Sequence, residues 1–148
     1  PYDWLGAFYN APHHVPSVNS LSIKNFLTNE WYSLDNNGKE ILYDRNFTTK
    51  KPYKRYKNIF ELRKTKCEYL SQTMPVIAKN YVLFSYDSFL RNHFNYLNII
   101  GQRFHLRKIG DPPPPISKRS YNFDPNIKEI IDNNLDWAVE ESLGYFQK

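Results

Sequence analysis

The sequence has little cysteine, no long apolar run and no glycine-rich loop. Its one cysteine, Cys67, excludes an internal disulfide and a zinc site built from several cysteines. No window approaches the roughly 18 consecutive apolar residues of a membrane-spanning helix. The N-terminal residues also lack the basic and apolar regions of a signal peptide. We therefore expect no membrane segment in these residues, and the sequence indicates no cellular location.

The length and composition are those of one folded domain. The chain has 148 residues, of which 41% are hydrophobic and 17% aromatic. A chain of this size buries roughly 70% of its unfolded surface when it folds. We find no internal repeat and no dividing linker, so residues 1–148 form a single segment. The net charge of +5 favours an anionic partner, although a charge of this size is also normal for solubility.

Residues 81–86 give the strongest structural signal in the chain. They are apolar, aromatic or β-branched almost throughout, which predicts a buried strand. From residue 89 to residue 104 the apolar residues recur at helical spacing, and Asp87 or Ser88 is the expected N-cap of that helix. A strand that is buried on both faces needs neighbours, and no other run has this character. Most of the sheet is therefore expected to lie outside these residues.

Further helices and one hairpin are predicted from caps and turn residues. Serine at position 20 or 22, Asn58, and Asp124 followed by proline are the expected helix starts, and Gly144 is the expected C-cap of the last helix. The helix that begins after Asn58 is expected to run to about residue 73 and to stop at Pro75. The sequence Asp-Asn-Asn-Gly at 35–38 predicts the turn of a small hairpin. The other predicted helices cover residues 2–9 and 21–31, and one or two closing helices are predicted over residues 125–143.

Five segments, in order along the chain, resemble P-loop sulfotransferases. Residues 1–9 resemble the family's R/K-N-P-x-D/A-W-L-x-S segment, and residues 58–66 resemble an N-x-x-x-L-R-x-x-K segment of a sulfotransferase-like group. Residues 86–90 resemble Y-E-D-x-L, residues 117–120 the S-K-G-R loop, and residues 136–145 the closing D-W-x-x-E-x-x-L-G-Y. The resemblance implies an α/β fold. The chain would be the C-terminal part of a three-layer α/β/α domain, mostly helical with one central strand.

The resemblance also implies a nucleotide cofactor, the sulfate donor PAPS. The family's basic loop wraps the 3′-phosphate of this donor, which assigns Ser117, Lys118 and Arg119 to cofactor binding. A lysine, an arginine and neighbouring hydroxyls suit a phosphate. By the same resemblance Tyr86 packs near the donor adenine. The alternative interpretations are a solvated basic loop and a buried tyrosine with a satisfied hydroxyl.

Arg63 and Lys66 are candidate substrate-binding residues. They are three positions apart in a predicted helix, so they share a face and could hold one anion together. A solvated basic helix face is the alternative. The catalytic base is unknown: the family's base usually lies upstream of residue 1, and His14 is the candidate within this chain. Because adjacent histidines such as His13 and His14 point apart, we expect no metal site.

The resemblance implies that the parent protein transfers sulfate from PAPS to a hydroxyl or amine of an acceptor such as a carbohydrate. No glycine-rich loop for the 5′-phosphosulfate is present, so we expect it in an N-terminal part of the same protein and expect this chain alone to be inactive. Ala7 replaces a phosphate-binding serine, which favours an inactive structural or interaction module as the alternative. Nucleic-acid binding through the basic, tyrosine-containing residues 50–57 is a third hypothesis, but no recognised nucleic-acid-binding fold surrounds them.

Overall fold

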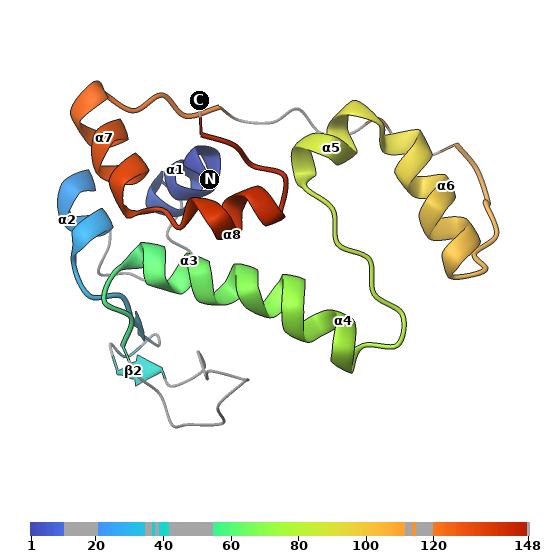
Figure 1. Ribbon diagram of the computed structural model, residues 1–148, viewed down its shortest axis with the longest axis horizontal. Helices are drawn as coiled ribbons and strands as arrows, with labels where there is room; N and C mark the ends of the chain where they lie inside the picture. The colour runs from blue at the N-terminus through green and yellow to red at the C-terminus, as the bar shows by residue number, and fades with distance from the viewer. Residues whose placement is uncertain are drawn as a thin grey trace.

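The computed structural model describes residues 1–10, 21–34, 37, 39–41, 55–111, 114 and 120–147, and this part of the chain is mostly helical (Figure 1). One π-helical turn, η2 (Tyr69–Thr73), interrupts a long helical rod. The α-helices in chain order are α1 (Tyr2–Asn10), α2 (Ile23–Thr28), α3 (Ile59–Glu68), α4 (Met74–Ile77), α5 (Tyr86–Arg91), α6 (His93–Arg103), α7 (Pro125–Asn134) and α8 (Trp137–Ser142).

The hydrophobic core lies where α1, α2, α3 and α7 meet. Leu5 of α1, Leu27 of α2, Ile59 of α3 and Ile131 of α7 are each completely buried. Figure 1 shows these helices and α8 gathered at one end of the molecule, while α5 and α6 lie at the other end. The amphipathic spacing of the apolar residues explains this arrangement, because each helix turns one stripe toward the shared core.

The predicted α/β fold with a central strand is wrong. Residues 81–85 form no strand, and Tyr86 is the first residue of α5. The physical reason is that a strand needs a backbone partner, whereas this segment makes side-chain contacts instead. The Tyr81 hydroxyl donates to the carbonyl of Leu70 over 2.8 Å, and the Phe84 ring stacks on Phe89 at 5.5 Å between centroids. The aromatic residues of segment 81–85 therefore contact residues that lie a short distance before or after them in the sequence.

The sheet in the described residues is a small hairpin. Strands β1 (Ser33–Leu34) and β2 (Glu40–Ile41) pair antiparallel, with Ser33 opposite Ile41. The two strands lie on either side of the turn predicted at 35–38, of which only residue 37 belongs to the described part of the chain. Just before it, Trp31 and Tyr56 exchange two backbone hydrogen bonds of 2.9 and 3.0 Å. This bridge ties the hairpin to the residues that lead into α3.

The helix ends follow the predicted caps in most places. The side chain of Ser22 accepts from Asn25 N, and that of Asn58 accepts from Phe60 N and Glu61 N. The side chain of Asp124 likewise caps α7, which has proline in its first turn, and Gly144 has φ of 83° just after α8. These predictions are confirmed.

Three predicted helix boundaries are wrong. The helix predicted over residues 21–31 ends at Thr28, and Trp31 instead forms a backbone bridge with Tyr56. The N-cap before the α5 segment is Ser85, whose hydroxyl accepts from Ser88 N, so the helix begins earlier than expected and breaks at Asn92 before α6. Pro75 does not stop the helical rod. The π-helical turn η2 directly precedes α4, and Pro75 lies in the first turn of α4, so the helical backbone continues past the proline to Ile77. None of the helices described is long and apolar enough to cross a membrane.

Candidate functional site

A cavity of about 390 Å³ opens between α1, α3, the segment 81–85 and the end of α8. It is lined by residues from parts of the chain that are far apart in sequence. α1 contributes Trp4, α3 contributes Arg63 and Lys66, and the C-terminal residues contribute Leu143 and Tyr145. The volume lies in the range of natural small-molecule sites.

A buried ion pair forms one wall of this region. Arg63 is 8% exposed and Glu140 is 2% exposed. The guanidinium donates through Nε to Oε1 over 2.5 Å and through a terminal nitrogen to Oε2 over 2.7 Å, which is a bidentate pair between α3 and α8. Burial by itself lowers the pKa of Arg63, but the hydrogen bonds and charge of Glu140 outweigh it and raise that pKa above its ordinary value.

Two aromatic rings enclose the same guanidinium. The Arg63 carbon Cζ lies 5.0 Å from the centroid of the Trp4 ring and 5.9 Å from that of Tyr145. Both distances are within the range of cation–π contact. Arg63 therefore joins α1, α3 and the C-terminal residues, and its charge is balanced by Glu140.

Arg63 and Lys66 both line the cavity, as expected for residues on one face of a helix. Their environments nevertheless differ. Lys66 is exposed whereas Arg63 is buried. The structure thus brings the two predicted substrate-binding residues together but gives them separate roles. Arg63 holds the carboxylate of Glu140, whereas Lys66 lies on an exposed part of the cavity lining.

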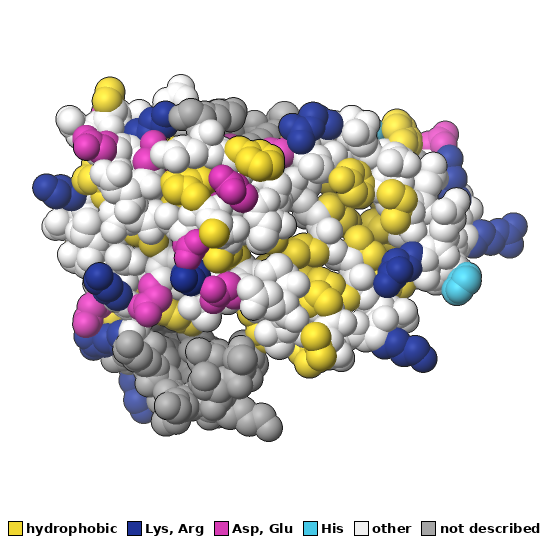
Figure 2. Space-filling model, in the orientation of Figure 1, with side chains coloured by type: hydrophobic (Ala, Val, Ile, Leu, Met, Phe, Trp, Pro, Cys, Tyr) yellow, Lys and Arg dark blue, Asp and Glu magenta, His cyan; other side chains and the backbone are white. Residues whose placement is uncertain are grey.

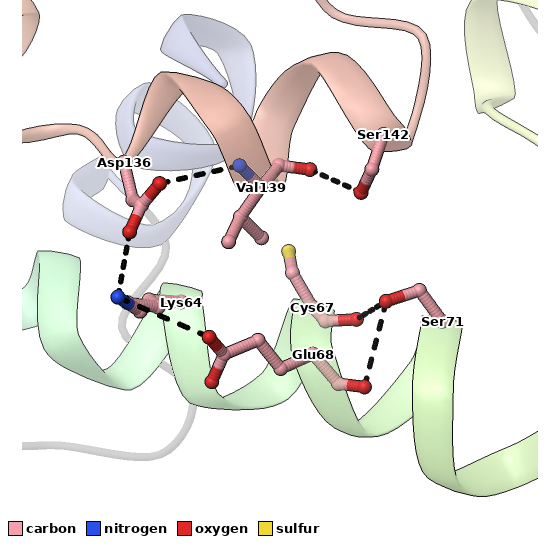
Figure 3. A network of polar contacts seen from close by, with 7 residues as sticks. All are labelled: Lys64, Cys67, Glu68, Ser71, Asp136, Val139 and Ser142. Carbon is pink, nitrogen blue, oxygen red and sulfur yellow. Dashed lines mark hydrogen bonds and ion pairs between the residues drawn. The ribbon is translucent and has the colours of Figure 1, made fainter.

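A second polar network joins α3 to α8 (Figure 3). Lys64 Nζ lies 2.6 Å from Asp136 and 3.9 Å from Glu68, and Asp136 also accepts from Val139 N as the N-cap of α8. The hydrogen bond from Lys64, followed by the one from Val139, holds the pKa of Asp136 below its ordinary value. A single aspartate thus caps α8 and fixes α8 against α3.

We expect Lys64→Met to raise the pKa of Asp136 toward its ordinary value, as measured by NMR titration of the Asp136 carboxyl carbon. Because the folded pKa lies below the unfolded one, this aspartate stabilises the protein at neutral pH, and the contribution is lost as pH falls through the folded pKa. Lys24→Met on α2 is the matched control and should leave the titration unchanged. An identical Asp136 titration in Lys64→Met and the unmodified chain would contradict the assignment.

Cys67 is the buried thiol of the cavity wall. Its exposed fraction is 7%, and burial raises its pKa above the ordinary value, while the nearby charge of Arg63 acts in the opposite direction. The thiol is therefore protonated at neutral pH, which is the unreactive form. No group of three or more metal-ligating side chains occurs in the described part of the chain.

Of the remaining predicted site residues, the structure describes only Tyr86. Tyr86 is 47% exposed and does not line the cavity, although its neighbour Ser85 does. It is therefore not the buried tyrosine of the alternative interpretation. His14 and the predicted phosphate loop Ser117, Lys118 and Arg119 lie outside the described residues, as do residues 50–54 of the basic loop.

Sequence reasoning missed the importance of Glu140. A signal was present, because Trp137, Glu140 and Leu143 are three positions apart and so share one face of the predicted last helix. A carboxylate between two large apolar residues on a helix face indicates a buried acid with a basic partner. The partner itself, 77 residues away, could not be found from this spacing.

No family model, curated protein or solved structure matches the chain.

Proposed function

We propose that this chain is part of a sulfotransferase-like protein that transfers sulfate from PAPS to a hydroxyl or amine of an acceptor, with carbohydrates among the candidate acceptors. One observation supports the proposal. Three of the segments that resemble this family meet around a single cavity, to which they contribute Trp4, Arg63 with Lys66, and Tyr145. These segments are spread over most of the sequence, so their meeting in space is not a consequence of proximity along the chain.

The proposal rests on these segments and does not require the central strand. In the transfer, the bond between sulfur and the donor phosphate oxygen breaks, a bond from sulfur to the acceptor oxygen or nitrogen forms, and the acceptor proton passes to a base. Such a step needs donors arranged around the moving sulfuryl group. An N-terminal part of the same protein would supply those donors from a glycine-rich loop, and this chain would supply Lys66 and the basic loop at 117–119.

We expect Lys118→Ala and Arg119→Ala in the intact parent protein each to weaken nucleotide binding by about 1.5–3 kcal/mol, the scale of a charge-assisted hydrogen bond. The measurement is calorimetric titration of 3′,5′-adenosine bisphosphate. Lys54→Ala removes the same charge from the other basic loop and is the control. Equal losses in all three variants would mean that general electrostatic attraction, rather than a phosphate loop, holds the nucleotide.

The second candidate function is an interaction module without chemistry. It is favoured by Ala7, an exposed residue of α1 at the position of the family's phosphate-binding serine. A methyl group cannot donate a hydrogen bond to a phosphate. The same titration decides between the two functions, because this module would bind no 3′,5′-adenosine bisphosphate in the intact parent.

A further inference from the structure

The helices α5 and α6 form a unit without a buried core. They pack on each other at the end of the molecule that lies away from α1, α2 and α7 (Figure 1). Neither helix contains a buried residue, although both carry several apolar and aromatic side chains. Phe94 in the first turn of α6 is 59% exposed. The apolar side chains of this unit are therefore incompletely covered within the described part of the chain.

The chain turns back after α6 and adds further exposed apolar side chains beside it. His105 has φ of 54°, and Leu106 N donates to the carbonyl of Gly101 over 2.8 Å, which closes the helix end. Residues 106–110 and α6 consequently line one pocket of about 420 Å³. Leu106 is exposed, and Ile109 is 98% exposed. Large apolar side chains that gather at the surface in this way mark an interaction site.

The charges at this pocket are positive. Residues 88–110 contain four Lys and Arg side chains and no acid, and two of these cations, Arg107 and Lys108, line the pocket. Lys108 pairs with Asp111 over 2.8 Å, but both side chains are largely exposed, so the pair is weak. The exposed guanidinium of Arg107 has no hydrogen bond or ion pair within the described residues. In Figure 2, dark-blue Lys and Arg side chains project from the α6 end of the visible face.

We propose that the end of α6 and the chain that folds back along it dock on an anionic lipid bilayer. The docking surface consists of Phe94, Leu106, Arg107, Lys108 and Ile109. Its apolar side chains enter the boundary between headgroups and acyl chains, while its cations stay at the level of the anionic headgroups.

The exposed position of Ile109 favours a bilayer over other anionic partners. A nucleic acid attracts cations through its phosphates but offers no apolar phase to an isoleucine side chain. An acidic protein would need a shaped pocket for this side chain, whereas a bilayer accepts it without one. Docking of this kind requires no membrane-spanning helix. It goes beyond sulfate transfer and does not depend on it, because it uses only the docking surface.

The test is sedimentation of the 148-residue chain with lipid vesicles. Phosphatidylcholine vesicles are compared with vesicles in which about a third of the lipid is the anionic phosphatidylserine. The chain is expected to bind the anionic vesicles about fivefold more tightly or more, since each cation near an anionic surface contributes a factor of about five. Arg107→Gln should weaken binding to the anionic vesicles about fivefold. Lys24→Gln on α2 removes the same charge from another exposed site and should leave binding unchanged.

A second pair of variants tests the apolar contact. Ile109→Ser should weaken binding to the anionic vesicles about tenfold or more, the scale of burying one isoleucine side chain. Val76→Ser on α4 is the matched control, because Val76 is also a β-branched and exposed residue but lies outside the docking surface. Both side chains project into solvent, so neither change should affect folding, which far-UV circular dichroism checks.

Three results of these experiments would overturn the proposal. The first is equal affinity of the chain for the two kinds of vesicle, and the second is an equal loss in Arg107→Gln and Lys24→Gln. The third is an unchanged affinity of folded Ile109→Ser, because no apolar side chain would then enter the bilayer. Soluble polyglutamate represents an acidic protein: if the chain bound it and sedimented with neither kind of vesicle, the surface would belong to a protein partner and the proposal would be wrong.

Discussion

Glu140→Ala is expected to lower the free energy of unfolding by about 3–5 kcal/mol, because the change leaves the buried Arg63 guanidinium without its counter-charge. The acid and the base are both almost completely buried and share two hydrogen bonds. Removal of the carboxylate forfeits these bonds, and the remaining charge has little water to solvate it. Urea denaturation followed by far-UV circular dichroism measures the loss.

The neighbouring acid is the matched control for this substitution. Glu141 is exposed, so Glu141→Ala should change stability by less than about 0.5 kcal/mol. The double variant Arg63→Met with Glu140→Leu should recover much of the loss, since a buried ion pair can be replaced by apolar side chains of similar volume. A cost below about 1 kcal/mol for Glu140→Ala would show that the pair is solvated, and its description as a buried ion pair would be wrong.

Gly6→Ala is expected to lower the free energy of unfolding by about 3 kcal/mol, the upper end of the usual cost of overpacking. A methyl group at this position would lie 2.3 Å from Cγ and 2.5 Å from Cβ of Tyr121. Cβ and Cγ are the first two atoms of the tyrosine side chain, so a change of rotamer cannot move both of them away. The backbone of α1 or of the segment before α7 has to shift. Thermal and urea denaturation give the cost.

Gly101→Ala is the control, because Gly101 is also inside a helix. A methyl group there would have its nearest contact at 3.7 Å, which is an ordinary van der Waals distance. Without a clash, alanine should stabilise α6 by roughly 0.5–1 kcal/mol relative to glycine. If the two substitutions have the same effect, the close approach of α1 to Tyr121 is not part of the folded state.

The sequence predicted the local features of the fold well. Asn58 and Asp124 cap their helices as expected, because an N-cap depends only on a side chain and the two or three residues after it. The small hairpin was found for the same reason, since its turn residues are next to each other. Ser85 was missed as a cap because Asp87 and Ser88, close behind it, are equally good cap residues.

The sequence of segment 81–85 alone could not decide whether it forms a strand. Residues 81–85 have a strand-like composition, but the formation of a strand is decided by partners elsewhere in the chain. The described structure offers none, and Phe84 packs on Phe89 and Tyr96 instead. The fold class inferred from this one segment was therefore wrong. The prediction of the closing helices was right, because their apolar residues repeat over several turns.

The candidate site was predicted in part. Arg63 and Lys66 do line one cavity, as their shared helix face required. Their different surroundings were not predictable, because a single sequence does not tell which of two neighbouring cations meets a distant acid. The pairing of Arg63 with Glu140 depends on how α8 crosses α3, and that geometry is set by the whole core.

The contacts between the two ends of the sequence have a consequence for biosynthesis. The Tyr2 hydroxyl donates to the carboxylate of Asp132, 130 residues later, and α1 shares the core with α7. At a translation rate of about 5–20 residues per second, roughly 6–26 s pass between synthesis of these two residues. During that interval the apolar stripe of α1 lacks its C-terminal partners. The part of α1 that packs on α7 therefore stays uncovered in the nascent chain until the last helices emerge.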